Sequence, residues 1–198
     1  MNKAVNIALA LMALFLLVLV TLFVATSDDD FADKPKHFSS LGGDFTLAAY
    51  NGEVSLSDYH GKVVVMYFGF LSCPEVCPNS MSTISNALDR LSDEQAAQTQ
   101  AILVSVDPKR DTPQKLADYV KYYHQSLIGL TGNKQQIDAV TNQYGAYYDF
   151  AEIESVTADY GVEHSSRYYV IDRNGELVTA MRHSTTPNEL AAQVKELL

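Results

Sequence analysis

The chain has 198 residues and carries 24 acidic against 14 basic side chains, which gives a formal net charge of −10 at pH 7. This balance argues against nucleic-acid binding, because phosphate contacts require Lys and Arg side chains. It also offers no basic patch for anionic lipid. The length suits one membrane segment followed by one domain with a substantial hydrophobic core.

The first 27 residues are almost free of charge. Lys3 is the one charged side chain before Asp28, and residues 5–25 are apolar except for Asn6 and Thr21. A helix of about 20 apolar residues crosses a hydrocarbon core of about 30 Å. The run is longer than the core of a signal peptide, about 7–15 residues. We therefore expect an uncleaved transmembrane helix within residues 1–27, with a removed signal peptide as the alternative.

Charges on either side of this segment predict its orientation. Lys3 precedes it and residues 28–30 are all Asp, so the positive-inside rule places the N-terminus in the cytoplasm and the domain outside. No Arg-rich and Ser-rich presequence of the mitochondrial type precedes the segment. We expect a single-pass protein of a bacterial inner membrane. A polar linker at 28–40 would join the anchor to a domain in the periplasm at 41–198.

The domain begins with β-structure. Segments at 45–47 and 54–56 flank Asn51-Gly52, a dipeptide that is typical of β-hairpins. The continuous apolar run VVVMYFGF at 63–70 predicts a strand that is buried on both faces.

Helices and strands are then expected to alternate to the C-terminus. Apolar runs predict strands at 101–106, 128–130, 147–153, 168–171 and 177–181. Apolar spacing and capping residues predict helices at 80–91, 113–123 and 134–144 and a last helix that opens at Thr186. The tight turn at Asn174-Gly175 makes the last strand pair antiparallel. This order predicts an α/β fold of the thioredoxin-like type, with a central mixed β-sheet flanked by helices and extra β-hairpins.

Both cysteines lie in the loop FGFLSCPEVCPNS, which follows the first buried strand. Cys73 and Cys77 are separated by three residues, and a proline follows each of them. Pro78 suits the first position of the next helix, which would make Cys77 its N-cap. The positive end of that helix would favour thiolates, which act as nucleophiles in disulfide exchange and as ligands for soft metals. The loop alone leaves both functions open. A structural disulfide is the weakest reading, because so short a loop gains little stability from a bridge.

Several motifs together resemble the Sco/SenC family. They are the cysteine loop, GGDFTL at 42–47, GKVVVMYFGF at 61–70, SVDPKRDTP at 105–113, LTG at 130–132 and DYGVEHSSRYYVIDRNGEL at 159–177. The resemblance extends from about residue 40 to the end, and the apolar N-terminal segment also suits the family. It implies a thioredoxin-like copper protein that helps to assemble the binuclear copper centre, CuA, of cytochrome c oxidase.

The resemblance also implies the ligands. The family binds copper through two loop cysteines and a distant histidine, which match Cys73, Cys77 and His164. Glu75 stands where many relatives have aspartate, a conservative departure. Thiolates select Cu(I), imidazole suits both copper states, and three ligands leave a position for an acceptor. Zinc normally requires four ligands, and a water molecule would have to complete its site. Copper, as Cu(I) or Cu(II), is thus the expected metal. The copper-acceptor subunit of a respiratory oxidase is the expected partner.

Other functions remain open beside this metallochaperone. As a thiol:disulfide oxidoreductase, the protein would reduce the cysteines of the copper-acceptor subunit. Cys73 would attack and Cys77 would resolve, with the reverse order as the alternative because Cys77 lies nearer the helix N-terminus. His164 would be dispensable or would only tune the reaction. The sequence does not decide whether the protein is such an enzyme. Peroxidase activity is disfavoured, because Phe70 stands where a Thr-x-x-Cys setting would place threonine.

The sequence gives weaker indications of function for several other polar residues. Asp107 is expected to be a turn residue before Pro108, with a supporting role beside the metal as the alternative. Glu163 would be suited to orient the ring of His164, although adjacency in sequence does not show this. Arg110 and Asp111 are expected to stabilise the turn and the helix start, and His183 is an outside candidate for a ligand.

Overall fold

The computed structural model describes residues 12, 40–151 and 160–198, and the statements that follow refer to these residues. The chain divides into two compact units, Met1–Lys34 and Pro35–Leu198, and the elements below belong to the second. The expected anchor at 1–27 and linker at 28–40 lie outside the described residues, apart from Met12 and Ser40. Within the described ranges, no helix combines the length and apolar character needed to cross a membrane.

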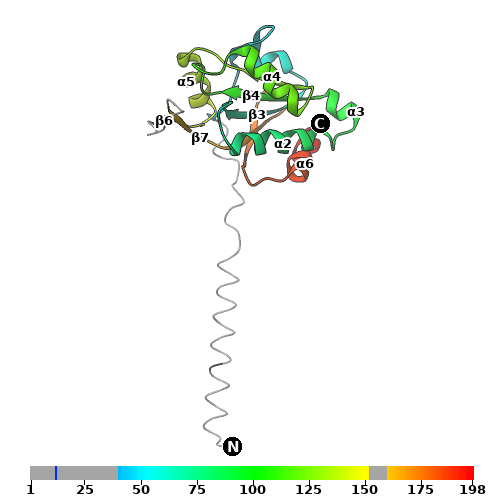
Figure 1. Ribbon diagram of the computed structural model, residues 1–198. Helices are drawn as coiled ribbons and strands as arrows, with labels where there is room; N and C mark the ends of the chain where they lie inside the picture. Colours follow the sequence, from blue (N-terminus) through cyan, green and yellow to red (C-terminus); the bar gives the residue numbers. More distant parts are fainter. Residues whose placement is uncertain (1–11, 13–39, 152–159) are drawn as a thin grey trace, which may run out of the picture. The chain divides into compact units, whose positions relative to one another are not determined.

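A mixed sheet of five strands forms the centre of the domain (Figure 1), with the strand order β5-β4-β3-β8-β9. The strands are β3 (Val63–Gly69), β4 (Thr99–Ser105), β5 (Leu127–Leu130), β8 (Arg167–Ile171) and β9 (Leu177–Arg182). Strand β4 runs parallel to β3 and β5, while β8 is antiparallel to β3 and β9. The predicted thioredoxin-like sheet and its antiparallel last pair are confirmed.

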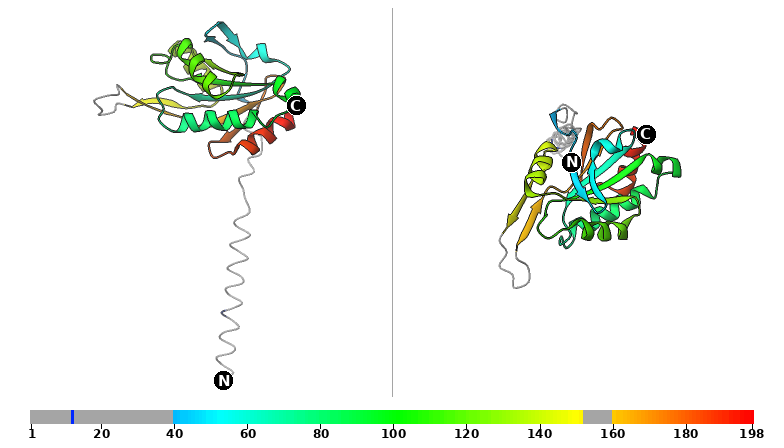
Figure 2. Two further views of the ribbon diagram at one scale, coloured as in Figure 1. Left: turned by 45° about the vertical axis from the view of Figure 1, so that its right-hand side comes forward. Right: turned by 90° about the horizontal axis from the view of Figure 1, so that it is seen from above.

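Both faces of the sheet are covered, which explains why every residue of β3 and β4 is buried. One face packs against α2 (Val76–Leu88), α4 (Pro113–Tyr123) and α6 (Pro187–Leu197). The other face packs against α5 (Lys134–Gln143) and the hairpin β1 (Thr46–Ala49) and β2 (Gly52–Ser55), which leads into the short 3₁₀ helix η2 (Leu56–Tyr59). Helices α2 and α6 lie side by side (Figure 2). Continuous apolar strands therefore predict this sandwich correctly.

Three helices begin at the N-caps that the sequence predicts. The side chains of Thr112, Asn133 and Thr186 each accept a hydrogen bond from the backbone N–H three residues further on. A short helix, α3 (Asp93–Ala97), is not among the predicted elements. Five residues are too few for apolar periodicity to show.

Helix α2 begins earlier than predicted. The sequence places Pro78 at its first position and Cys77 at its N-cap, but the N-cap is Glu75 and Val76 is the first helical residue. That prediction is wrong because a proline is tolerated throughout the first turn, where backbone N–H groups have no partner within the helix. Cys77 therefore lies inside the first turn, and Cys73 lies before it.

A second two-stranded ribbon, β6 (Tyr148–Ala151) and β7 (Gly161–His164), stands apart from the main sheet (Figure 1). The sequence predicts a strand at 147–153 but no strand at 161–164. Four residues that include Gly161 and the exposed Glu163 give too weak an alternation to identify a strand. The ribbon places His164 at the end of β7, opposite Tyr148.

Candidate metal centre

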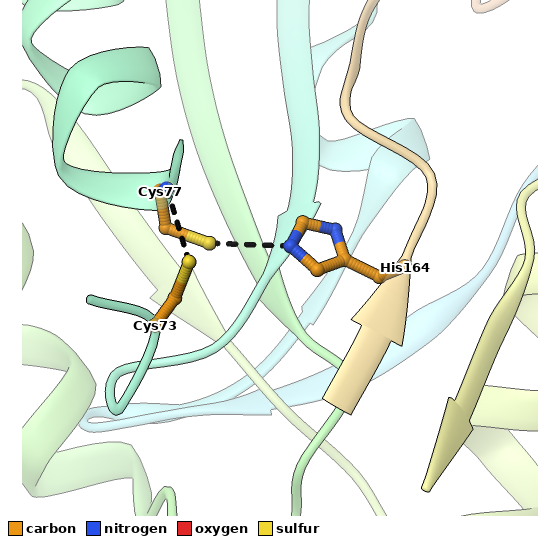
Figure 3. Close-up of side chains that lie close together, drawn as sticks. All are labelled: Cys73, Cys77 and His164. Carbon is orange, nitrogen blue, oxygen red and sulfur yellow. Dashed lines mark hydrogen bonds between the residues drawn. The ribbon is translucent and has the colours of Figure 1, made fainter. Parts of the chain in front are cut away.

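Three side chains from separate parts of the chain meet beyond the carboxyl end of β3 (Figure 3). Cys73 comes from the loop after this strand, Cys77 from the first turn of α2 and His164 from the end of β7. Their sulfur and ring nitrogen atoms all lie within 4.8 Å of one another. The structure thus brings together the three residues that the family resemblance names.

The surroundings of Cys73 stabilise its thiolate form. Its sulfur accepts a hydrogen bond from the backbone N–H of Cys77, 3.3 Å from the nitrogen. That N–H belongs to the first turn of α2, where the helix dipole favours negative charge. The hydrogen bond from the Cys77 thiol is the main cause that lowers the pKa of Cys73 to about 4. In the metal-free protein at neutral pH, Cys73 is therefore the anion of the pair.

Cys77 keeps its proton in the metal-free protein. Its side chain is fully buried, and its sulfur lies 3.4 Å from Nε2 of His164. The hydrogen bond to the Cys73 thiolate, together with burial, raises the pKa of Cys77 far above the usual range of a thiol. Metal binding must displace this proton, since a thiolate is the form that binds metals.

The ring of His164 directs its Nε2 towards the cysteines. Its Nδ1 lies 3.1 Å from the carbonyl oxygen of Ser165, which can only accept a hydrogen bond, so Nδ1 carries the proton. In the neutral ring, Nε2 is then the nitrogen with the free lone pair, and it lies 3.4 Å from Sγ of Cys77. The rings of Tyr67 and Phe70 meet His164 edge-on, with centroids at 6.0 and 5.6 Å. The hydrogen bond to Ser165 therefore favours the tautomer whose Nε2 can bind a metal.

The spacing of the three donors fits a single ion. Thiolate and imidazole bonds to zinc are about 2.3 and 2.0 Å long, so three such ligands around one ion lie roughly 3.5–4 Å apart. The observed separations of up to 4.8 Å require only a small inward movement of the side chains. The two cysteines are not joined by a disulfide in this structure, so both sulfurs are free to bind.

Gly69 leaves the space that the Cys77 sulfur occupies. A Cβ at this position would lie 2.9 Å from Sγ of Cys77 and 3.1 Å from Cε1 of Tyr67. We expect Gly69→Ala to lower the free energy of unfolding by about 1–3 kcal/mol, as overpacking does. It should also weaken metal binding, because the sulfur is displaced. Urea denaturation and a Cu(I) competition titration measure the two effects.

Gly52→Ala is the control for this prediction. Gly52 has a φ of +130°, and a Cβ there would meet nothing within 4 Å. The control should lose stability through backbone strain and keep its metal affinity. Equal metal affinities for Gly69→Ala and wild type would contradict the prediction.

The remaining polar residues lie around this group. Asp107 is fully buried, and its carboxylate accepts hydrogen bonds from Arg110 and Tyr160, so it does more than form the predicted turn. Glu163 is exposed, and the ring of His164 bonds to Ser165 instead.

Asp111 bonds to Ser105 across the turn that it is expected to stabilise, and it also has a partner outside this turn. Asp111 accepts the backbone N–H of Leu71 in the cysteine loop, a role that a single sequence does not reveal. Nδ1 of His183 lies 3.2 Å from Oγ of Ser80, and this histidine is not part of the Cys73, Cys77 and His164 group.

Comparisons with known proteins agree on one family. A family model described as SCO1/SenC matches residues 33–198. A "SCO2-like protein" of Rickettsia felis is 36% identical over 156 residues, which cover 78% of this chain and 76% of the relative.

Solved structures of the same fold point the same way. The copper-bound structure of ScoI from Bradyrhizobium japonicum superposes with a TM-score of 0.72 and is 34% identical, over 80% of this chain and 99% of that one. The copper-bound structure of ScoI from Arabidopsis thaliana gives a TM-score of 0.73 at 34% identity, over 79% and 97% of the two chains. The family model alone covers most of the chain, and the chain therefore belongs to the SCO1/SenC family.

Proposed function

We propose that this protein binds copper through Cys73, Cys77 and His164 and helps to assemble the CuA centre of a cytochrome c oxidase. The observation that carries the proposal is the convergence of two sulfurs and one imidazole nitrogen within 4.8 Å. Two soft thiolates suit Cu(I), and the neutral imidazole suits both copper states. Two structural relatives, from B. japonicum and A. thaliana, are described with copper bound. The role in oxidase assembly is the one that membership of the family implies.

Copper delivery requires that the metal can leave. Three protein ligands leave a coordination position to which a ligand from an acceptor can bind. Cys77 is fully buried, whereas Cys73 is 8% exposed and His164 is half-buried. An acceptor would therefore approach from the side of Cys73 and His164, and Cys77 would be the last ligand to release the metal.

We also propose that residues 1–27 anchor the protein in a bacterial inner membrane, with the domain in the periplasm. The support is the apolar run at 5–25 and the charges that flank it. Expression with a C-terminal alkaline phosphatase fusion tests the orientation. Phosphatase activity in cells supports a periplasmic domain, and an inactive but intact fusion would contradict it.

Copper stoichiometry and spectra test the proposed site. We expect the reduced full-length protein in detergent to bind about one copper per chain. Its Cu(II) form should show sulfur-to-copper charge transfer in absorption and nitrogen hyperfine structure in EPR. His164→Ala should keep the thiolate contribution and lose the nitrogen signal. Failure of the wild type to bind copper would refute the proposal, as would unchanged Cu(II) spectra in His164→Ala.

A second candidate function is reduction of a disulfide in the copper-acceptor subunit, and the inequality of the two thiols favours it. The Cys73 thiolate would attack one sulfur of the target disulfide, form a mixed disulfide and release the other sulfur as a thiolate. Cys77, once deprotonated, would then attack Cys73. This releases the second target thiolate and leaves a Cys73–Cys77 disulfide, which another thiol reductant must reduce.

Complementation separates the two functions. In a strain that lacks the protein, delivery of copper requires His164, whereas reduction of the acceptor requires only the cysteines. We expect His164→Ala to fail to restore oxidase activity. Full restoration by this variant would favour the reductase.

A further inference from the structure

The turn at residues 105–111, which connects β4 to α4, contacts both halves of the metal centre. It contains two acidic side chains, Asp107 and Asp111, that are 0% and 1% exposed. Carboxylates are almost never fully buried unless they are paired. The partners of these two side chains therefore indicate what the turn does.

Asp111 holds the half of the centre that carries the cysteines. Its Oδ2 accepts the backbone N–H of Leu71 at 2.9 Å and the hydroxyl of Ser105 at 2.6 Å. Leu71 lies two residues before Cys73, so the cysteine loop is tied to the end of β4. The Ser105 hydroxyl oxygen also accepts the backbone N–H of Asp107 at 3.1 Å, which links this half to the second carboxylate.

Asp107 holds the half that carries the histidine. Its Oδ1 accepts the hydroxyl of Tyr160 at 2.7 Å, and its Oδ2 is paired with the Nε–H of Arg110. Arg110 in turn donates from Nη1 to the carbonyl oxygen of Tyr160 at 3.2 Å and lies 3.9 Å over its ring. Tyr160 directly precedes β7, which ends at His164. The start of this strand is thus held by both its backbone and its side chain.

Arg110 is also connected to His164 through the ring of Phe70. Its guanidinium lies 5.9 Å from the ring centroid of Phe70, which stands three residues before Cys73. The Phe70 ring meets the imidazole of His164 edge-on at 5.6 Å. Arg110 therefore packs against both Tyr160, which precedes β7, and Phe70, whose ring meets the ring of His164.

Strand β7 needs such support. Among the described residues it is four residues long and pairs only with β6, outside the main sheet. A two-stranded ribbon is marginally stable alone in water. Side-chain contacts with the body of the domain must therefore fix where His164 lies.

We infer that Asp107, Arg110 and Tyr160 form a clamp that positions His164 beside the two cysteines. These three are positioning residues, since none of them belongs to the ligand group. The effect of the clamp on copper rests on the proposed function, whereas its effect on the ring of His164 does not. The turn at 105–111 thereby sets the distance between the sulfur ligands and the nitrogen ligand.

Tyr160→Phe tests the clamp, because it removes only the hydroxyl and keeps the ring under Arg110. In the metal-free protein, we expect the NOEs between the His164 ring protons and the rings of Tyr67 and Phe70 to weaken or vanish. With copper, we expect the Cu(II) affinity to fall by about 10–100-fold, as for other residues that orient metal ligands. The nitrogen hyperfine signal should weaken while the thiolate absorption persists.

A double-mutant cycle separates positioning from general destabilisation. In a His164→Ala background, Tyr160→Phe should cause no further loss of Cu(II) affinity, because the nitrogen that it positions is absent. An equal loss in both backgrounds would overturn the inference. Arg110→Lys keeps the charge beside Asp107 but lacks the planar guanidinium, and it should give the same pattern as Tyr160→Phe.

Tyr147→Phe is the matched control, one residue before β6 of the same ribbon. Tyr147 is exposed, and its hydroxyl bonds at 3.3 Å to Asp149, two residues further on in β6. This variant should keep both the NOEs and the nitrogen signal. Unchanged NOEs and an unchanged nitrogen signal in Tyr160→Phe would overturn the clamp. If the wild type binds no copper, the proposed function fails, while the NOEs of the metal-free protein still decide the clamp.

Discussion

Cys77→Ser is expected to reduce the affinity for Cu(I) by more than about 100-fold, since even partners that only orient ligands cost 10–100-fold. Cys77 is fully buried, and its sulfur lies 3.4 Å from Nε2 of His164. The serine oxygen is a hard donor that Cu(I) does not prefer. The variant would leave one thiolate and one imidazole for the metal. Competition with a chromophoric Cu(I) chelator measures the affinity of the reduced protein.

Ser80→Ala is the control for this substitution. Ser80 is fully buried one turn further along α2, and its hydroxyl lies 3.2 Å from Nδ1 of His183. This substitution changes a buried polar group of the same helix but removes no ligand. It therefore shows whether such a change alone disturbs the metal centre. We expect Ser80→Ala to keep its Cu(I) affinity within a few-fold. A Cys77→Ser protein that binds Cu(I) within ten-fold of wild type would contradict a ligand role for Cys77.

The layered fold follows from local patterns. The uninterrupted apolar segments of β3 and β4 identify strands that need cover on both faces, and the observed helices supply it. Caps such as Thr112, Asn133 and Thr186 place helix starts to the residue, because the cap and its helix are neighbours in sequence. These elements are predictable since each signal lies within the segment that it describes.

The start of α2 shows where such local rules are insufficient. The rule that places proline at the first helical position predicts the start at Pro78, but the helix begins at Val76. Proline fits any first-turn position, so the choice depends on the surrounding structure. This shift of the helix start by two positions matters, because it determines which of the two sulfurs accepts a hydrogen bond from a free N–H of the first turn. It is Cys73 rather than Cys77.

The histidine half of the centre could not be derived from residue spacing. His164 lies 87 positions after Cys77, and its strand β7 has no strong pattern of its own. Only the family resemblance named it in the sequence. The contacts that hold it, from Asp107 and Arg110 to Tyr160, join segments about 50 residues apart. Such pairings depend on tertiary structure, which a single sequence does not encode in any local motif.

A single thiolate is expected to persist in the reduced, metal-free protein down to a pH of about 4, because hydrogen bonding lowers the pKa of Cys73 to that value from an ordinary 9.0. Thiolate absorbance in the ultraviolet should therefore show one thiolate per chain between pH 6 and 8, with a midpoint near 4. Cys77→Ala should raise this midpoint, since the thiol of Cys77 is the main hydrogen-bond donor to Cys73. Absorbance is preferable to alkylation rates here, because the nucleophilicity of a thiolate falls as its pKa falls.

The same shift makes the stability of the reduced protein depend on pH, with a sign that can be checked. A pKa that is lower in the folded than in the unfolded state stabilises the folded protein fully above the unfolded value near 9. The contribution declines as the pH falls and is lost below the folded value of about 4. The difference in unfolding free energy between wild type and Cys73→Ser should therefore grow from pH 4 towards pH 9. A difference that is constant over this range, or that shrinks as the pH rises, would show that Cys73 is not the anionic member of the pair.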